Sequence, residues 1–138
     1  QRGVSSDLDE SIELHRAALL LRPPGHSDRP ESLNNLAVSL RDRFTQRGVS
    51  SDLDESIELH RAALLLRPPG HSNRSGSLNN LATSLRGRFT QRGVSSDLGE
   101  SIELHRAALL LRPPSHFDRS ESLANLAVSL RDRFTQRG

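Results

Sequence analysis

The sequence predicts an all-α protein, a solenoid of repeated helix-turn-helix units with six helices in total. Two observations support this prediction. The tripeptide Gln-Arg-Gly recurs at a step of 45 residues, at positions 1–3, 46–48, 91–93 and 136–138. Self-similarity at a period of 20–50 residues is typical of solenoids in which each unit stacks on its neighbours. Each copy also holds two stretches of helical apolar periodicity and no alternating strand pattern.

We expect residues 1–138 to form one repeat array rather than a globular domain. Its copies span 1–45, 46–90 and 91–135, and residues 136–138 begin a fourth copy. There is no initiator methionine, and both ends fall at the same phase of the repeat. These features suggest a piece of a longer array.

Composition favours a soluble, cytoplasmic protein without a cofactor. The chain has no cysteine, so neither a disulfide nor a thiolate metal site is possible. No apolar run approaches the roughly 18–20 residues that span a bilayer, and no secretory signal pattern is present. The formal net charge is only +2, which is a weak signal for nucleic-acid binding.

The first helix type is predicted over residues 7–22, 52–67 and 97–112. In the second copy, Asp52 and Glu55 have the spacing of an N-cap residue and its N3 partner. Pro68 and Pro69 follow at the other end, where a proline cannot continue a helix. Asp7, Asp9 and Glu10 lack the glycine and distal glutamate of a calcium loop, so we interpret this acidic cluster as helix capping.

The second helix type is predicted from about residue 29 to 46. Asp28 and Glu31 repeat the capping spacing, and Gly48 stands where a left-handed C-terminal cap belongs. Its apolar stripe is narrow: Leu33, Leu36, Ala37, Leu40 and Phe44. The first helix type has a wider apolar face, comprising Leu53, Ile57, Leu59, His60, Ala62, Ala63, Leu64 and Leu66. A wide face suggests a helix between two partners, so the second type should line an open, concave surface.

The strings "SLNNLAVSLRDRF" and "SIELHRAALLLRPPGH" resemble the tetratricopeptide repeat (TPR), in the lengthened form of kinesin light chains. In the family's pattern, Leu33, Leu36 and Ala37 match the first helix, and Ser56 and Ala63 match the second. Leu40 and His60 stand where the family has aromatic residues. The resemblance implies a right-handed superhelix that binds peptides without chemistry of its own. Similar repeats occur in long arrays attached to regulatory modules.

The resemblance also implies a peptide groove lined by amides, which can bond both donors and acceptors of an extended backbone. Arginines on the same flank could hold a carboxylate, so a protein or peptide partner with acidic groups is expected. The alternative is that the asparagines are only the polar edge of an amphipathic helix. The candidate groove residues are Asn34, Asn35, Arg41, Asn79, Asn80, Arg86, Asn125 and Arg131; Ala124 replaces one amide in the third copy.

The histidines and the triplicated polar residues argue against an enzyme. His15, His60 and His105 fall on the wide apolar face, where we expect packed, hydrogen-bonded core residues rather than metal ligands. The remaining histidines, His26, His71 and His116, are expected in turns. A catalytic site is a single constellation, whereas nearly every polar residue here occurs three times.

Two other functions remain open from the sequence. RNA-binding helical repeats read bases with side chains that vary between repeats, and the candidate positions here barely vary. The few aromatics also offer little for bases to stack on: Phe44, Phe89, Phe117 and Phe134. The second alternative is a structural spacer inside a larger regulatory protein.

The two ends of the array predict head-to-tail self-association. The first helix lacks a preceding partner and the last lacks a following one, while the repeats are nearly identical. The last helix of one molecule could therefore occupy the place before the first helix of another. The residues expected at these ends are Leu8, Ile12, Leu19, Leu123, Leu126, Leu130 and Phe134, with Ala127 and His15 beside them.

Overall fold

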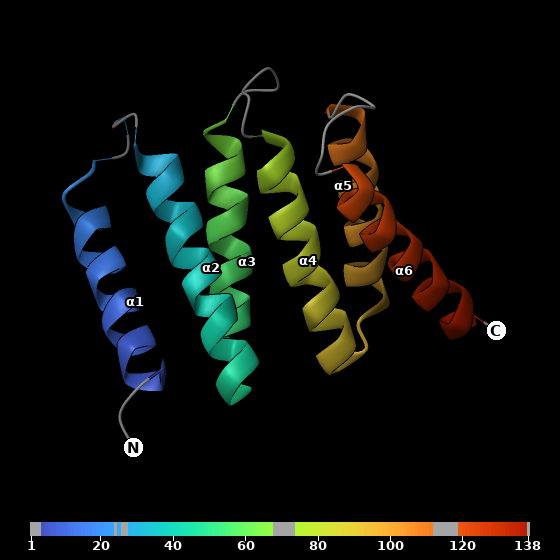
Figure 1. Ribbon diagram of the computed structural model, residues 1–138, viewed down its shortest axis with the longest axis horizontal. Coiled ribbons are helices and arrows are strands. Elements are labelled where there is room, and N and C mark those ends of the chain that lie inside the picture. Colours follow the sequence, from blue (N-terminus) through green and yellow to red (C-terminus); the bar gives the residue numbers. More distant parts are fainter. Residues whose placement is uncertain (1–3, 24, 26–27, 68–73, 112–118, 138) are drawn as a thin grey trace. The chain divides into compact units, whose positions relative to one another are not determined.

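The computed structural model describes residues 4–23, 25, 28–67, 74–111 and 119–137. Within these residues the chain is entirely helical apart from turns, which confirms the all-α helical-repeat fold (Figure 1). The helices are α1 (Val4–Leu20), α2 (Arg29–Arg47), α3 (Ser50–Leu65), α4 (Arg74–Arg92), α5 (Ser95–Leu111) and α6 (Arg119–Arg137). The predicted turn residues Pro68, Pro69, His26, His71 and His116 lie outside the described residues.

The helices fall into two compact units of three. One unit covers residues 1–67 with α1, α2 and α3, and the other covers residues 68–138 with α4, α5 and α6. In the first unit α2 packs more closely against α3 than against α1, and in the second α4 packs more closely against α5 than against α6. The closest packing therefore joins the end of one 45-residue copy to the start of the next.

The connections inside these close pairs are two residues long and depend on glycine. Gly48 ends α2 with φ of 72°, and its N–H donates to the carbonyl of Phe44 at 2.6 Å. Gly93 repeats this after α4, with φ of 73° and a 2.6 Å bond to the carbonyl of Phe89. Left-handed backbone at a helix C-terminus favours glycine because other residues carry a Cβ penalty there. The prediction of a glycine C-cap at Gly48 is confirmed.

Of the predicted N-terminal caps, Asp28 occupies the N-cap position of α2, whereas Asp52 is not the cap of α3. Helix α3 begins at Ser50, its cap residue is Val49, and no side chain caps it. Asp52 instead lies inside the first turn and accepts from Arg43 Nε at 2.8 Å and Nη2 at 2.9 Å. Asp28, although it is the N-cap residue of α2, makes no side-chain cap bond. A bidentate arginine–carboxylate pair is stronger than a bond to one backbone N–H, so the carboxylate serves the helix pair and not the helix end.

Arginine side chains bind carbonyl groups at the ends of the first helix type. Arg29 Nη1 donates to the carbonyls of Leu19 at 3.4 Å and Arg22 at 2.5 Å. Arg119 Nη1 donates to the carbonyl of Leu109 at 2.9 Å. The last carbonyls of a helix have no partner within it, so Arg29 and Arg119, the first residues of α2 and α6, supply donors that α1 and α5 need.

The core of the first unit is built from all three of its helices. Ile12, Leu36 and Leu40 are buried together, with Leu8, Leu19 and Leu59 packed around them. Ile12 was expected at the open end of the array, and that expectation is wrong because Ile12 is completely buried in this core. The predicted apolar stripe of α2 is buried at every position but one, since Phe44 is only half-buried.

Serine at the α2–α3 contact lets the two backbones approach closely. The buried hydroxyl of Ser56 donates to the carbonyl of Ala37 at 2.7 Å. In the second unit, Ser101 donates to the carbonyl of Ala82 at 2.8 Å. Both alanines are fully buried. This bond fixes the register of each close helix pair.

The predicted burial of the wide apolar face is confirmed for residues in the middle of α3 but is wrong at the C-terminal end. Leu53, Ile57 and Ala63 are buried, whereas Leu66 lies beyond the end of α3 and is exposed. Neighbouring Leu65 is more exposed still. The last turn therefore projects past the packed part of the helix.

Candidate peptide-binding surface

The predicted groove asparagines lie at the edge of the packed surface of their helices. On α2, Asn34 is half-buried and Asn35 is exposed. Asn79, Asn80 and Asn125 are half-buried on α4 and α6. The buried Oδ1 atom of Asn79 has no hydrogen-bond partner in the part of the chain that the structure describes.

The three predicted groove arginines differ in what they bind. Arg86 on α4 donates from Nε at 2.9 Å and from Nη2 at 2.7 Å to the same oxygen, Oδ2 of Asp132 on α6. It therefore already holds a carboxylate of its own unit. Arg41 and Arg131 make no ion pair with any described residue. The position equivalent to Asp132 in the second copy is Gly87, which has no carboxylate.

The positive charge of Arg41 affects the pKa of the buried His60. The ring is 1% exposed, and burial, followed by repulsion from Arg41, lowers its pKa to about 4. Neither ring nitrogen has a hydrogen-bond partner among the described residues. The predicted burial is confirmed, but the predicted hydrogen bonding is wrong for this histidine. The equivalent His105 is also 1% exposed, while His15 is only half-buried.

Asp9 and Asp52 belong to an ion-pair network around α2 that was not predicted from the sequence. Arg43 bridges two helices, with Asp52 on α3 and Asp9 on α1, whose Oδ1 lies 3.1 Å from Nη1. Arg47 also reaches Asp9 at 2.8 Å. Bonds from Arg47 and then Arg43 lower the pKa of Asp9, and the bond to Asp52 raises that of Arg43. The nine-residue spacing from Arg43 to Asp52, repeated from Arg88 to Asp97, was the available signal.

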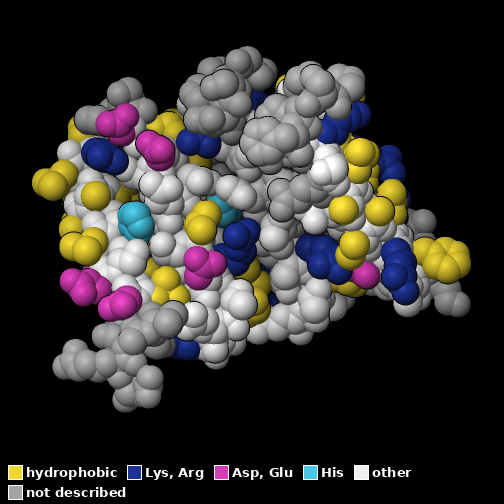
Figure 2. Space-filling model, in the orientation of Figure 1, with side chains coloured by type: hydrophobic (Ala, Val, Ile, Leu, Met, Phe, Trp, Pro, Cys, Tyr) yellow, Lys and Arg dark blue, Asp and Glu magenta, His cyan; other side chains and the backbone are white. Residues whose placement is uncertain are grey.

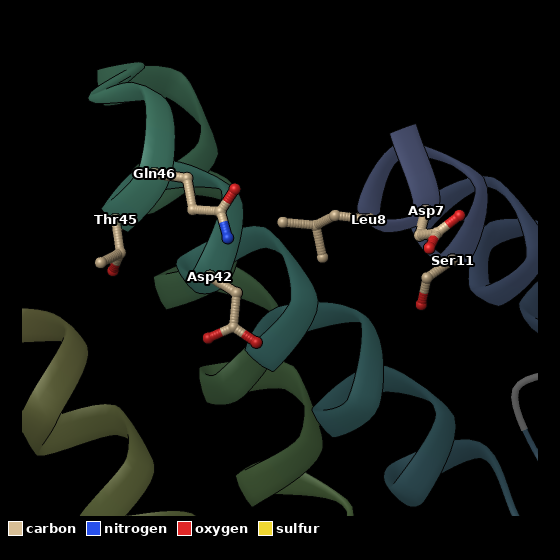
Figure 3. Close-up of a pocket in the computed structure, with 6 residues that line it drawn as sticks. All are labelled: Asp7, Leu8, Ser11, Asp42, Thr45 and Gln46. Carbon is tan, nitrogen blue, oxygen red and sulfur yellow. The ribbon is translucent and has the colours of Figure 1, made fainter. Parts of the chain in front are cut away.

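A cleft of about 490 Å³ opens between α1 and α2 at the end nearest the α2 C-terminus (Figure 3). Leu8 points into the space between the two helices, and Asp42 and Gln46 extend from α2 beside it. Asp7 and Ser11 lie on the α1 side, and Thr45 completes the lining. Asp7 and Asp42 make the cleft acidic, so it does not suit an acidic peptide.

A second hollow of about 630 Å³ lies at the other end of α1. Its arginines are engaged in bonds within the unit. Arg16 holds Glu55 with bonds of 2.7 and 3.1 Å, Arg22 bonds to Ser32, and Arg29 bonds to backbone carbonyls. The hollow therefore offers no spare positive charge to a ligand. Arg41, the predicted groove arginine of the first unit, remains available to bind a ligand.

The described residues include no group of three or more His, Asp or Glu side chains placed to hold a metal ion. Across the same residues, each helix is too short or too polar to cross a bilayer. The chain matches no protein-family model and no curated protein. Its resemblance to the tetratricopeptide repeat is thus an expectation from its own motifs.

Proposed function

We propose that the chain is a non-catalytic scaffold that binds an extended segment of a partner protein along its asparagine-bearing helices. The observation that carries this proposal is Arg41, a half-buried arginine without an acidic partner among the described residues. It lies on the same helix as the amides of Asn34 and Asn35. A charged group that gains no internal partner is suited to an anion from outside.

The spacing on α2 fits an extended peptide. Arg41 follows Asn34 by seven residues, so the two side chains share a face of the helix, about 10 Å apart along its axis. An extended strand covers that distance in about three residues. The amide would bond the peptide backbone, and the guanidinium would bond a carboxylate about three residues further along.

Two further points support a binding role without chemistry. An asparagine recurs at the same position of α2, α4 and α6, as Asn35, Asn80 and Asn125, as expected for repeated contacts with a peptide and not for one reaction centre. The resemblance to the tetratricopeptide repeat implies the same kind of ligand. Nucleic acid is disfavoured because Arg43, Arg47 and Arg86 are already paired with carboxylates.

An array of immobilised ten-residue peptides tests the proposal. One set carries single glutamates on neutral backbones, and a matched set carries glutamine at the same positions. We expect the glutamate peptides to be retained and the glutamine peptides to be retained at least tenfold less, because a charge-assisted hydrogen bond contributes about 1.5–3 kcal/mol. Arg41→Gln should remove the difference.

The matched control is Arg61→Gln, which removes an arginine that lies within 3.9 Å of Glu58 on α3. It should leave peptide retention unchanged. Equal retention of both peptide sets by the wild-type chain would contradict the proposal. Retention of single-stranded RNA with a steep loss at high salt, in place of peptide retention, would favour the nucleic-acid alternative.

A further inference from the structure

The two surfaces that meet in the close α2–α3 packing also occur elsewhere in the chain. Helix α1 repeats the sequence of α3, and helix α6 repeats that of α2. Residues 4–20 of α1 are identical in sequence to residues 49–65, which cover α3. Helix α6 matches α2 at 17 of 19 positions, with Ser120 for Pro30 and Ala124 for Asn34. The surfaces of α1 and α6 therefore have the residues that recognise each other inside the first unit.

On α1, the residues that correspond to the α2-binding residues of α3 lack the partners that α3 has. Asp7 corresponds to Asp52, yet it is exposed and makes no ion pair with any described residue. The hydroxyl of Ser11 corresponds to that of Ser56 and likewise has no hydrogen-bond partner in the described ranges. These two residues line a hollow of about 340 Å³ on α1, together with Glu10, Leu14 and His15. The hollow lies where α2 packs on the equivalent face of α3.

On α6, apolar residues are exposed whose equivalents on α2 and α4 are buried. Leu123 is 48% exposed, whereas its equivalents Leu33 and Leu78 are each 5% exposed. Ala127 is exposed, although the equivalent alanines are completely buried, and Phe134 is 78% exposed. Figure 2 shows hydrophobic side chains gathered over α6, with basic side chains among them.

The charges of the two faces are complementary. Helix α1 has four carboxylates and one arginine, and helix α6 has four arginines and two carboxylates. Arg133, which corresponds to Arg43, makes no ion pair among the described residues. Position 99 on α5, which corresponds to Asp9, is a glycine. Arg133 thus has no carboxylate at position 99, where the equivalent Arg43 finds Asp9.

A second charge pair follows from the bond between Arg86 and Asp132. Arg131 is the residue that corresponds to Arg86 in the next copy, and Asp42 is the one that corresponds to Asp132 in the first copy. Both are exposed, and neither makes an ion pair with a described residue. Asp42 lines the same cleft as Asp7 (Figure 3), so one face presents two carboxylates that no described residue pairs with. Helix α6 presents two arginines, Arg131 and Arg133, that are likewise unpaired among the described residues.

We propose that the outer face of α1 docks α6 of a second copy of this chain, in the geometry of the α2–α3 packing. Arg133 of one molecule pairs with Asp7 of the next, and Ser11 donates to the carbonyl of Ala127. Arg131 pairs with Asp42. Ile12 is not part of this contact because it belongs to the core of its own unit. The contact joins two different surfaces, so each added molecule leaves one of each free and growth continues unless a ring closes.

Sedimentation velocity of the 138-residue chain over a hundredfold concentration range tests the proposal. We expect the average mass to rise with concentration, and Asp7→Arg and Arg133→Asp each to keep the chain monomeric. A mixture of these two variants should associate again, because every contact between unlike molecules restores one opposite-charge pair. The double variant, with both changes in one chain, should also associate.

Glu13→Arg is the matched control, since it reverses an exposed charge on α1 that lies beside Arg16 and not in the hollow. It should associate like the wild type, and all variants should keep the wild-type circular dichroism and Tm. A wild-type chain that stays monomeric at every concentration would overturn the proposal. So would single variants that associate as the wild type does, or a mixture that stays monomeric. The readout needs no peptide, so it is independent of the proposed binding function.

Discussion

Acidification should destabilise the first unit through His60. The folded-state pKa of this histidine is about 4, and its ordinary value is 6.5. Above pH 6.5 the ring is neutral in both the folded and the unfolded chain, so it contributes no pH dependence there. Below pH 6.5 the unfolded chain takes up a proton that the folded chain does not, and stability falls until the pH reaches about 4.

The size of this effect follows from the pKa difference. One pKa unit corresponds to about 1.36 kcal/mol, so the full difference is worth about 3 kcal/mol. Between pH 7.5 and pH 5, the loss due to His60 should be about 2 kcal/mol. His60→Leu removes the titrating ring and should remove this part of the loss. Arg41→Gln should remove a smaller part, because burial is the larger cause of the shift and Arg41 the smaller.

Urea denaturation at pH 7.5, 6.5, 5.5 and 5 measures the effect, since a change in midpoint at constant slope reports stability. The difference between the His60→Leu and wild-type free energies of unfolding isolates the histidine from the carboxylates that titrate in the same range. Arg61→Gln is the control and should follow the wild-type curve. A difference that stays constant from pH 7.5 to 5 would refute the reasoning, because it would mean that the ring is accessible to protons in the folded chain.

Four substitutions test the packing and the backbone of the helix pairs by thermal or urea unfolding. Ser56→Ala should cost about 1 kcal/mol by removing the bond to the Ala37 carbonyl, whereas Ser11→Ala should leave the monomer within about 0.5 kcal/mol of wild type; equal costs would contradict the role of the bond. Gly48→Ala should destabilise by about 1–2 kcal/mol because of its left-handed backbone. Gly76→Ala, in a helix with open space around the new methyl group, should stabilise by up to about 1 kcal/mol, and a loss there would contradict this prediction.

The sequence was sufficient for the helices and much of the buried surface. The 45-residue period and the apolar spacing placed all six helices, and Gly48 marked the end of α2 because left-handed backbone leaves a clear residue preference. The sequence was less informative about acidic residues. Asp52 has the type and position of a cap residue, and only the packed pair shows that its carboxylate faces Arg43 instead.

The candidate surface shows the same limit. Arg41, Arg86 and Arg131 are equivalent in sequence, and periodicity alone assigned them one role. They differ in their partners because of residues about 45 positions further along the chain. Arg86 pairs with Asp132, whereas Gly87 stands at the equivalent position for Arg41. Repeat position therefore predicts which face a side chain occupies, while its electrostatic partner depends on small departures from the repeat.

A double-mutant cycle between Arg41 and a peptide carboxylate tests peptide recognition most directly. Calorimetric titration would compare the wild-type chain and Arg41→Gln, each with the best-retained glutamate peptide and with its glutamine counterpart. We predict a coupling free energy of about 1.5–3 kcal/mol between the guanidinium and the carboxylate. A coupling indistinguishable from zero, with both peptides bound equally by both proteins, would contradict recognition of an acidic segment by Arg41.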